Sequence, residues 1–329
     1  MKLSDFDYSL PKELIAQYPL KKRDAARLLV LNRSQGRIEH RIFKDITEYF
    51  DEGELLVLNN TKVLPSRLIG SRLTGGKVEL LLLRQKSALA FEALIRPGRV
   101  RPDEKIIFNG GKIYCRVSAR NEVTFNAKDT GTIYNLGMMP LPPYIKRKPE
   151  DLDSVYYQTI YAKEEGSIAS PTAGLHFTEE LIGQIKARGV DISHITLHIN
   201  YSTFKPVKTE DVTSHKMDKE SFRVGKEAED KINQARLGKA RVFAVGTTAC
   251  RALEAYALGE RQGYTDLFIY PGYKFKMTDC LITNFHLPRT TLFMLVCAFA
   301  GEKLIRKAYD EAICRKYRFY SYGDAMLIV

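Results

Sequence analysis

Two histidines lie in short polar stretches that separate apolar segments of the chain. His176 is near the end of the stretch SPTAGLHF, and His286 lies in NFHLPR, just before the apolar run 292–300. A histidine with a pKa near neutrality can accept or donate a proton in catalysis. A buried turn whose polar side chains only satisfy backbone groups has the same appearance, so one such stretch alone does not indicate a site.

A third stretch of this kind, Gly246-Thr247-Thr248, follows the apolar residues 241–245 (RVFAV). We expect all three stretches where a strand ends and a helix begins, at the edge where open α/β sheets bind ligands. Free N–H groups at a helix N-terminus suit a carboxylate or a phosphate, and Gly174 and Gly246 permit close approach to the backbone. The three stretches together predict a ligand site. Their sequences match neither the dinucleotide fingerprint nor the P-loop.

The other histidines and the cysteines show no strong metal-binding pattern. His194 and His198 fall on one face of an alternating strand (ISHITLHI), but no third ligand is in view. The five cysteines have no CxxC spacing, and four of them lie in apolar contexts. We therefore expect no metal, and the reduced thiols of a cytoplasmic protein.

The composition is that of a globular protein with a strong basic excess. The 329 residues are 44% hydrophobic and 27% charged, a length that allows about two domains. The longest apolar run, 292–300, is much shorter than the roughly 18 residues of a membrane-spanning helix. The first residues, MKLSDFDYSLPKEL, lack the apolar core of a signal peptide. The net charge of +12 favours a polyanionic partner such as nucleic acid.

The elements that would position these residues alternate between strand and helix. We predict strands at 27–32, 54–58, 191–199, 241–245, 267–270 and 280–283, and helices at 46–50, 177–188, 227–237, 247–258, 292–300 and 304–316. This alternation predicts an α/β fold whose sheet is mixed or mainly parallel and is covered by helices.

Residues 63–149 have a different pattern. Short alternating runs at 66–72, 77–84, 89–95, 105–108, 112–118 and 122–127 are separated by Gly-Gly, Pro-Gly and Asn turns. They predict a small antiparallel barrel or sandwich, followed by the proline-rich connection LGMMPLPPYIKRKP. We therefore predict a discontinuous α/β domain formed by 1–62 and 150–329, with an all-β barrel domain inserted at 63–149.

Several long motifs resemble those of the S-adenosylmethionine:tRNA ribosyltransferase-isomerase family. They are FDYSLPKELIAQYPLKKRDAARLLVL (6–31), LNNTKVLPSRL (58–68), MPLPPYI (139–145), SPTAGLHF (170–177), VGTT (245–248), TDLFIYPGYKF (265–275), LITNFHLPRTTLFMLVCAFAG (281–301) and YRFYSYGDAMLI (317–328). The resemblance runs from end to end. It implies an α/β domain with an inserted β-barrel domain, which agrees with the pattern above.

The resemblance also implies a reaction, a step in queuosine synthesis. The ribosyl part of S-adenosylmethionine would be transferred to the 7-aminomethyl group of a 7-deazaguanine in the tRNA wobble position. The ribose would rearrange to an epoxycyclopentane while adenine and methionine leave, giving epoxyqueuosine-tRNA. S-adenosylmethionine would be a consumed co-substrate, tRNA the partner, and no tightly bound cofactor or metal is expected.

This chemistry assigns candidate roles to residues of the motifs. A sulfonium acidifies the neighbouring C5′ hydrogen, so a base should begin the reaction, and His176 is slightly preferred over His286. Departing adenine needs a proton, which the other histidine or Asp324 would direct or supply. Substrate contacts are expected from Thr172, Gly174, Phe177, Gly246, Thr247, Thr248, Asn284, Phe285 and Tyr322, and tRNA phosphate contacts from Lys62, Arg67, Lys146, Arg147, Lys148 and Arg289.

One stretch departs from the family's pattern, and it leaves two other hypotheses open. Where the family has the Gly-rich VGAGTF, this chain has Ile199-Asn200-Tyr201-Ser202-Thr203-Phe204. One alternative is a tRNA-binding protein of the same fold without catalysis. The other is a transferase that uses S-adenosylmethionine on a different acceptor and releases adenine without tRNA. Nothing in the sequence demands a dimer, so a monomer is the default expectation.

Overall fold

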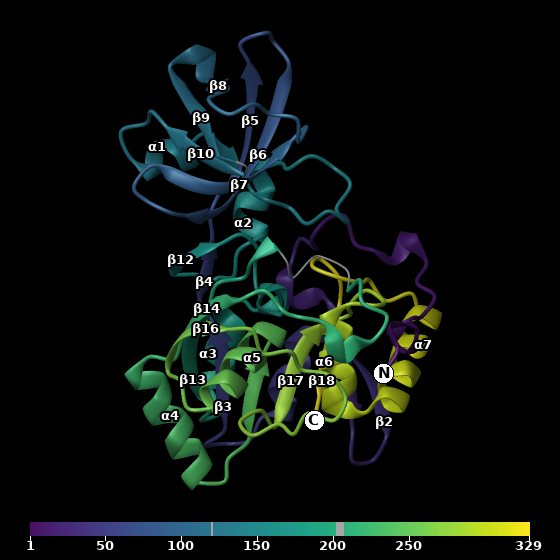
Figure 1. Cartoon of the computed structure of the whole chain (residues 1–329). Helices are drawn as coiled ribbons and strands as arrows, with labels where there is room; N and C mark the ends of the chain where they lie inside the picture. Colours follow the sequence, from purple (N-terminus) through teal and green to yellow (C-terminus); the bar gives the residue numbers. More distant parts are fainter. Residues whose placement is uncertain (120, 202–206) are drawn as a thin grey trace.

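The computed structural model describes residues 1–119, 121–201 and 207–329. It consists of a β-barrel above a larger α/β part (Figure 1). The strands of the α/β sheet, in spatial order, are β16 (Gln262–Thr265), β14 (Glu220–Arg223), β13 (Asp191–Leu197), β3 (Leu55–Asn59), β15 (Val242–Val245), β17 (Cys280–Asn284), β18 (Ala325–Ile328), β1 (Arg27–Asn32) and β2 (Arg37–Ile42). The central strands β13, β3, β15 and β17 are parallel, β1 is parallel to β18, and the other neighbours are antiparallel. The sheet is therefore mixed, and the carboxyl ends of its parallel centre meet at one edge.

Apolar side chains alternate between the two faces of this sheet because successive strand residues point in opposite directions. Leu55 and Val57 belong to one buried cluster, and Leu56 and Leu58 to the other. The first cluster includes side chains from α4 (Lys226–Leu237), α5 (Thr247–Tyr256), α6 (Thr291–Ala300) and α7 (Glu302–Cys314). The second includes side chains from α3 (Glu179–Ala187) and the 3-10 helix η4 (Phe43–Tyr49). Burial on both faces explains the continuous apolar runs of the central strands.

The smaller part is a closed antiparallel barrel with its own core. Its strands, in spatial order, are β5 (Arg67–Arg72), β6 (Lys77–Gln85), β7 (Ala90–Arg96), β10 (Glu122–Phe125), β9 (Ile113–Ala119) and β8 (Lys105–Phe108), and pairing of β8 with β5 closes the barrel. β11 (Gly137–Met138) pairs with β5, and α1 (Thr130–Tyr134) adds Ile133 to the barrel core.

The chain enters the barrel through β4 (Thr61–Val63) and continues after it through α2 (Asp151–Tyr156) and β12 (Glu164–Ser167). β4 and β12 pair in parallel beneath the barrel (Figure 1). All barrel strands lie within the predicted insertion 63–149, and we propose that this stretch is a domain of its own. The remaining short 3-10 helices are η1 (Leu3–Phe6), η2 (Lys12–Leu14), η3 (Arg23–Ala25), η5 (Asn109–Gly111), η6 (Thr172–His176) and η8 (Val212–Ser214).

One predicted element is wrong, and two others differ in detail. The segment predicted as helical at 46–50 belongs to the 3-10 helix η4. Residues 267–270 form no strand, because their apolar side chains pack on the core as an irregular segment and the Leu267 carbonyl accepts a hydrogen bond from Arg251 Nε (3.1 Å). Helix α3 begins at Glu179, where the hydroxyl of Thr178 accepts the N–H of Leu181 (3.1 Å) as an N-cap.

Candidate functional site

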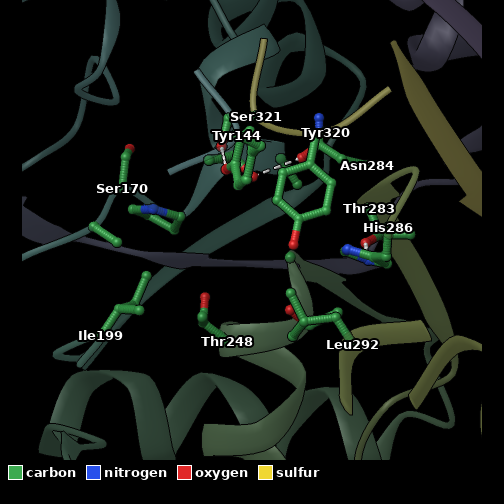
Figure 2. A pocket seen from close by; sticks show the side chains of 16 residues that line it. Tyr144, Ser170, Ile199, Thr248, Thr283, Asn284, His286, Leu292, Tyr320 and Ser321 are labelled. Atoms are coloured by element: carbon green, nitrogen blue, oxygen red, sulfur yellow. Dashed lines mark hydrogen bonds between the residues drawn. The ribbon is translucent and has the colours of Figure 1, made fainter. Parts of the chain in front are cut away.

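A pocket lies at the carboxyl edge of the parallel strands, where the three predicted stretches meet (Figure 2). The Gly246-Thr247-Thr248 turn follows β15, Asn284 ends β17, and Thr172 belongs to η6. The residues that line the pocket are Tyr144, Ala169, Ser170, Pro171, Thr172, Ala173, Ile199, Gly246, Thr247, Thr248, Thr283, Asn284, His286, Leu292, Tyr320 and Ser321. Segments far apart in the chain thus build one site, which we call the edge pocket.

The N-terminus of α5 forms one wall of the edge pocket. Gly246 has a φ of +89°, a left-handed conformation that glycine adopts without strain. As the N-cap it has no side chain to satisfy the N–H groups of the first helical turn. Thr248 Oγ1 also lines the pocket and accepts a hydrogen bond from the buried Asn59 Nδ2 (3.2 Å). This wall therefore presents hydroxyls and helix N–H donors, which suit an anionic or hydroxyl-bearing ligand.

Ser170 contributes a buried hydroxyl without a partner. The residue is 4% exposed, and its Oγ has no hydrogen-bond partner among the residues that the structure describes. An unpaired buried hydroxyl costs roughly 1–3 kcal/mol. A ligand in the edge pocket that pairs with this hydroxyl would remove the cost.

Asn284 connects the edge pocket to His176. Its Oδ1 accepts a hydrogen bond from Thr172 Oγ1 (2.9 Å), and its Nδ2 donates to His176 Nε2 (3.1 Å). The same Nδ2 lies 3.5 Å from the carbonyl oxygen of Asp324. These contacts engage both ends of the amide, so Asn284 holds the wall of the pocket beside His176.

The two histidines have different surroundings. His286 lines the edge pocket, and its Nε2 lies 2.8 Å from Thr283 Oγ1. His176 faces a second, smaller pocket and packs on Phe43, with 4.9 Å between ring centroids. Burial lowers the pKa of His286 to about 3 and the pKa of His176 to about 4. Both rings are therefore neutral at pH 7, and the position of His286 makes it the better candidate base, in contrast to the preference drawn from the sequence.

Asp324 lines neither pocket. It is 1% exposed, and its carboxylate accepts hydrogen bonds from the backbone N–H of Arg27 (2.9 Å), from Arg27 Nε (3.1 Å) and from the backbone N–H of Arg318 (2.8 Å). This carboxylate joins the start of β1 to the turn before β18. The proton transfer to adenine that the sequence suggested for Asp324 stays a prediction.

Four predicted substrate contacts belong to the core or to the second pocket. Phe177 and Phe285 are fully buried in core clusters and line neither pocket. A Cβ on Gly174 would lie 2.0 Å from the hydroxyl oxygen of Tyr161, so packing requires glycine there. Tyr322 lines the second pocket, beside His176.

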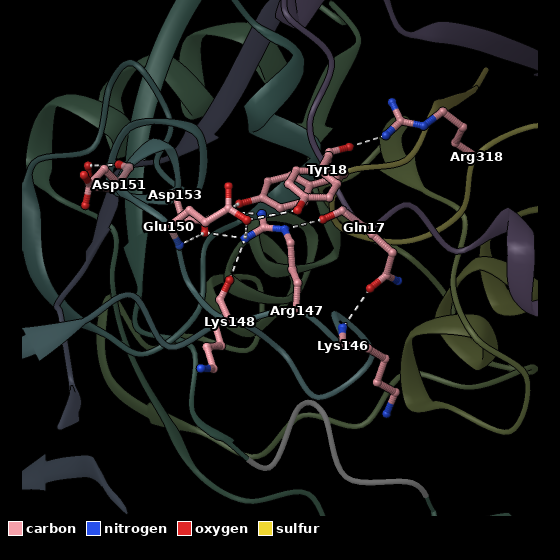
Figure 3. A network of polar contacts seen from close by, with 11 residues as sticks. Gln17, Tyr18, Lys146, Arg147, Lys148, Glu150, Asp151, Asp153 and Arg318 are labelled. Atoms are coloured by element: carbon pink, nitrogen blue, oxygen red, sulfur yellow. Dashed lines mark hydrogen bonds and ion pairs between the residues drawn. The ribbon is translucent and has the colours of Figure 1, made fainter. Parts of the chain in front are cut away.

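The predicted phosphate contacts include one arginine that is held internally. Arg147 is 11% exposed and donates from both terminal nitrogens to the carboxylate of Asp153, at 2.7 Å each (Figure 3). The other paired side chains are Lys62 with Glu165, Arg67 with Glu79, and Arg289 with Asp7. Arg147 is therefore a structural anchor of the proline-rich connection.

The side chains of Lys146 and Lys148 extend away from the pair formed by Arg147 and Asp153 (Figure 3). Together with Arg67 and Arg96 they line a cleft between the barrel strands and the proline-rich connection, which we call the basic cleft. With Arg147, this lining holds five cationic side chains against the one carboxylate of Glu79, which suits a phosphate backbone.

The sequence did not single out Tyr144, Tyr320 and Ser321, which also line the edge pocket. The hydroxyls of Tyr144 and Ser321 are hydrogen-bonded (2.5 Å), and the rings of Tyr144 and Tyr320 lie edge to face, with centroids 3.8 Å apart. In the sequence, only the three neighbouring hydroxyl-bearing residues of YSYG could have indicated them.

The volume of the edge pocket is about 50 Å³, well below the roughly 300–1,000 Å³ of small-molecule sites. A ligand of the usual size would therefore require lining side chains such as Tyr144 to move.

The stretch that departs from the family's pattern begins beside the edge pocket. Ile199 lines the pocket, and Asn200 donates its backbone N–H to Glu220 Oε1 (2.9 Å) and its Nδ2 to the carbonyl of Lys219 (2.7 Å). Residues 202–204 lie outside the described residues.

Within the described ranges, no three His, Cys, Asp or Glu side chains gather as a metal site would require. No helix in these ranges has the length and apolar character needed to cross a membrane.

Comparison with known proteins gives one consistent result. Residues 3–328 match the family model described as "Queuosine biosynthesis protein". The S-adenosylmethionine:tRNA ribosyltransferase-isomerases of Sulfurihydrogenibium sp. (strain YO3AOP1) and Symbiobacterium thermophilum are 53% and 51% identical, over 100% of both chains in each case. The crystal structure of the S-adenosylmethionine tRNA ribosyltransferase from Thermotoga maritima is similar, with a TM-score of 0.58, 38% identity, and coverage of 99% of this chain and 100% of that one.

Proposed function

The chain belongs to the family of queuosine biosynthesis proteins, and from this premise we propose that its edge pocket binds S-adenosylmethionine. The protein is an enzyme, an S-adenosylmethionine:tRNA ribosyltransferase-isomerase, as are the relatives that match it over their full length. S-adenosylmethionine is a substrate of this reaction. The observation that carries the proposal is the meeting of three polar stretches at the carboxyl edge of the sheet, within a chain that is about half identical to these enzymes from end to end.

The acceptor we propose is the 7-aminomethyl group of a 7-deazaguanine in the wobble position of tRNA. A nitrogen–carbon bond forms to the ribosyl part of S-adenosylmethionine, and the bonds from the ribose to sulfur and to adenine break. Adenine and methionine leave, and the ribose becomes the epoxycyclopentane of epoxyqueuosine. The basic cleft supports this proposal because its cations suit the phosphates of a large polyanion.

We assign the base that removes the C5′ proton to His286. The ring is neutral at pH 7, because burial lowers its pKa to about 3. When Nε2 donates to Thr283 Oγ1, the lone pair of Nδ1 is available to a substrate. The Nε2 lone pair of His176 already accepts the amide N–H of Asn284. His176 is therefore a positioning residue that holds Asn284 and, through it, Thr172.

Adenine release from S-adenosylmethionine tests this function. The protein should release adenine only when tRNA carrying the 7-aminomethyl-7-deazaguanine is present. Release without any tRNA would indicate a different acceptor. Binding of this tRNA with no release under any condition would indicate a tRNA-binding protein without catalysis.

A further inference from the structure

Tyr320 has a backbone conformation that is rare for an aromatic residue. Its φ is +73°, in the left-handed region, although the side chain is bulky and only 6% exposed. Conformations of this kind are strained for bulky residues and persist where the surrounding structure enforces them, often at ligand sites. A glycine would adopt this φ without strain, so the backbone alone gives no reason for an aromatic side chain here.

The surrounding turn holds Tyr320 in place from both sides. Its N–H donates to the carbonyl of Phe285 (3.0 Å), and its own carbonyl accepts the N–H of Gly323 (2.8 Å). A Cβ on Gly323 would lie 2.5 Å from the carbonyl oxygen of Arg318, so the turn closes too tightly for a side chain at that position. The N–H of Asp324 donates to the same carbonyl (2.7 Å). The strained conformation is therefore fixed by the fold.

This conformation directs the Tyr320 side chain into the edge pocket. Figure 2 shows the ring inside the pocket, with its hydroxyl directed away from Tyr144 and Ser321. The hydroxyl has no hydrogen bond to any residue in the described part of the chain, whereas Tyr144 is bonded to Ser321. Burial raises the pKa of Tyr320 well above its ordinary value, so the hydroxyl keeps its proton and can donate it in a hydrogen bond.

We propose that Tyr320 is a substrate-binding residue whose hydroxyl donates a hydrogen bond to S-adenosylmethionine in the edge pocket. This inference rests on the proposed function of that pocket. The acceptor is an oxygen or nitrogen of the ligand, in its nucleoside half or in its amino-acid half. Tyr320 would bind and orient the ligand without transferring a proton.

The Tyr320→Phe variant tests the proposal, because it removes the hydroxyl and keeps the ring. With saturating tRNA, the KM for S-adenosylmethionine should rise about three- to tenfold, the loss expected for one hydrogen bond. The midpoint of thermal unfolding and the affinity for tRNA should not change. Tyr161→Phe is the matched control, since it removes a tyrosine hydroxyl that is buried without a partner in the described part of the chain, and Tyr161 lines neither pocket.

Binding of 5′-methylthioadenosine, measured by calorimetry on both variants, locates the acceptor. If Tyr320→Phe loses as much affinity for 5′-methylthioadenosine as for S-adenosylmethionine, the hydrogen bond is to the nucleoside half. If this variant loses affinity for S-adenosylmethionine alone, the hydrogen bond is to the amino-acid half. A Tyr320→Phe enzyme with the KM of the unaltered enzyme overturns the proposal. If the unaltered enzyme releases no adenine with its tRNA, the proposed function itself has failed.

Discussion

Ser170 and Ser193 each bury a hydroxyl that has no partner among the described residues, but only Ser170 lines the edge pocket. We expect Ser170→Ala to weaken S-adenosylmethionine binding about three- to tenfold, because a ligand hydrogen bond is lost. Ser193→Ala should leave this binding unchanged. Calorimetric titration of both variants gives the comparison. Equal affinities in the two variants would show that Ser170 does not contact the ligand.

The two buried histidines predict how stability depends on pH. Their pKa values fall from the ordinary 6.5 to about 4 for His176 and about 3 for His286, because burial disfavours the charged ring. The unfolded chain therefore binds more protons, and stability that is fully present above pH 6.5 is lost as pH falls through 6.5 towards these values. The loss should reach about 1.4 kcal/mol per pH unit for each histidine.

Urea unfolding of the unaltered protein and of His286→Gln between pH 4 and pH 7 measures this loss. The variant should show a smaller decrease of the free energy of unfolding on acidification. An identical decrease in both proteins would mean that His286 is not buried as described.

At the scale of elements, Asp324 ties β1 to the turn before β18 through Arg27 and the backbone of Arg318. We expect Asp324→Asn to lower the free energy of unfolding by roughly 1–3 kcal/mol, because hydrogen bonds to a charged group are weakened. The KM for S-adenosylmethionine should stay the same. Urea unfolding and adenine release measure the two effects. Normal stability with lost activity would instead support the role of Asp324 as an acid.

The sequence predicted the edge of the sheet well, because strand ends and helix caps are local features. Glycine and threonine after RVFAV indicated the start of α5, and the apolar run after Thr290 indicated α6. The sequence could not show that Asn284, in the wall of the pocket, is hydrogen-bonded to His176, since this contact depends on how η6 packs on β17. The apolar run 267–270 looked like a strand because a segment that packs on the core without strand pairing is apolar as well.

Tyr320 and Ser170 were missed for a related reason. A tyrosine among aromatic neighbours and a serine before proline look like core and turn residues in a sequence. Only the left-handed turn at Tyr320 and the closed surroundings of Ser170 place their hydroxyls in the pocket.

At the scale of the whole molecule, the basic cleft is a place where the positive net charge of +12 can act on a polyanion. We expect Lys148→Gln to weaken tRNA binding about threefold or more, and to reduce the slope of log affinity against log salt by about 0.7 to 1. Lys239→Gln, at an exposed residue just after the C-terminal end of α4, is the control and should change neither quantity. Filter binding over a range of salt concentrations gives both values. A slope that does not change in Lys148→Gln would place the tRNA elsewhere.

The central claim is that the edge pocket holds S-adenosylmethionine, and a crystal structure of the protein grown with this ligand tests it most directly. We predict density for the ligand between the N-terminus of α5, Ser170 and Tyr320, with Tyr144 displaced to make room. Ligand density beside His176 in the second pocket, or in the basic cleft, with the edge pocket empty, would contradict the account.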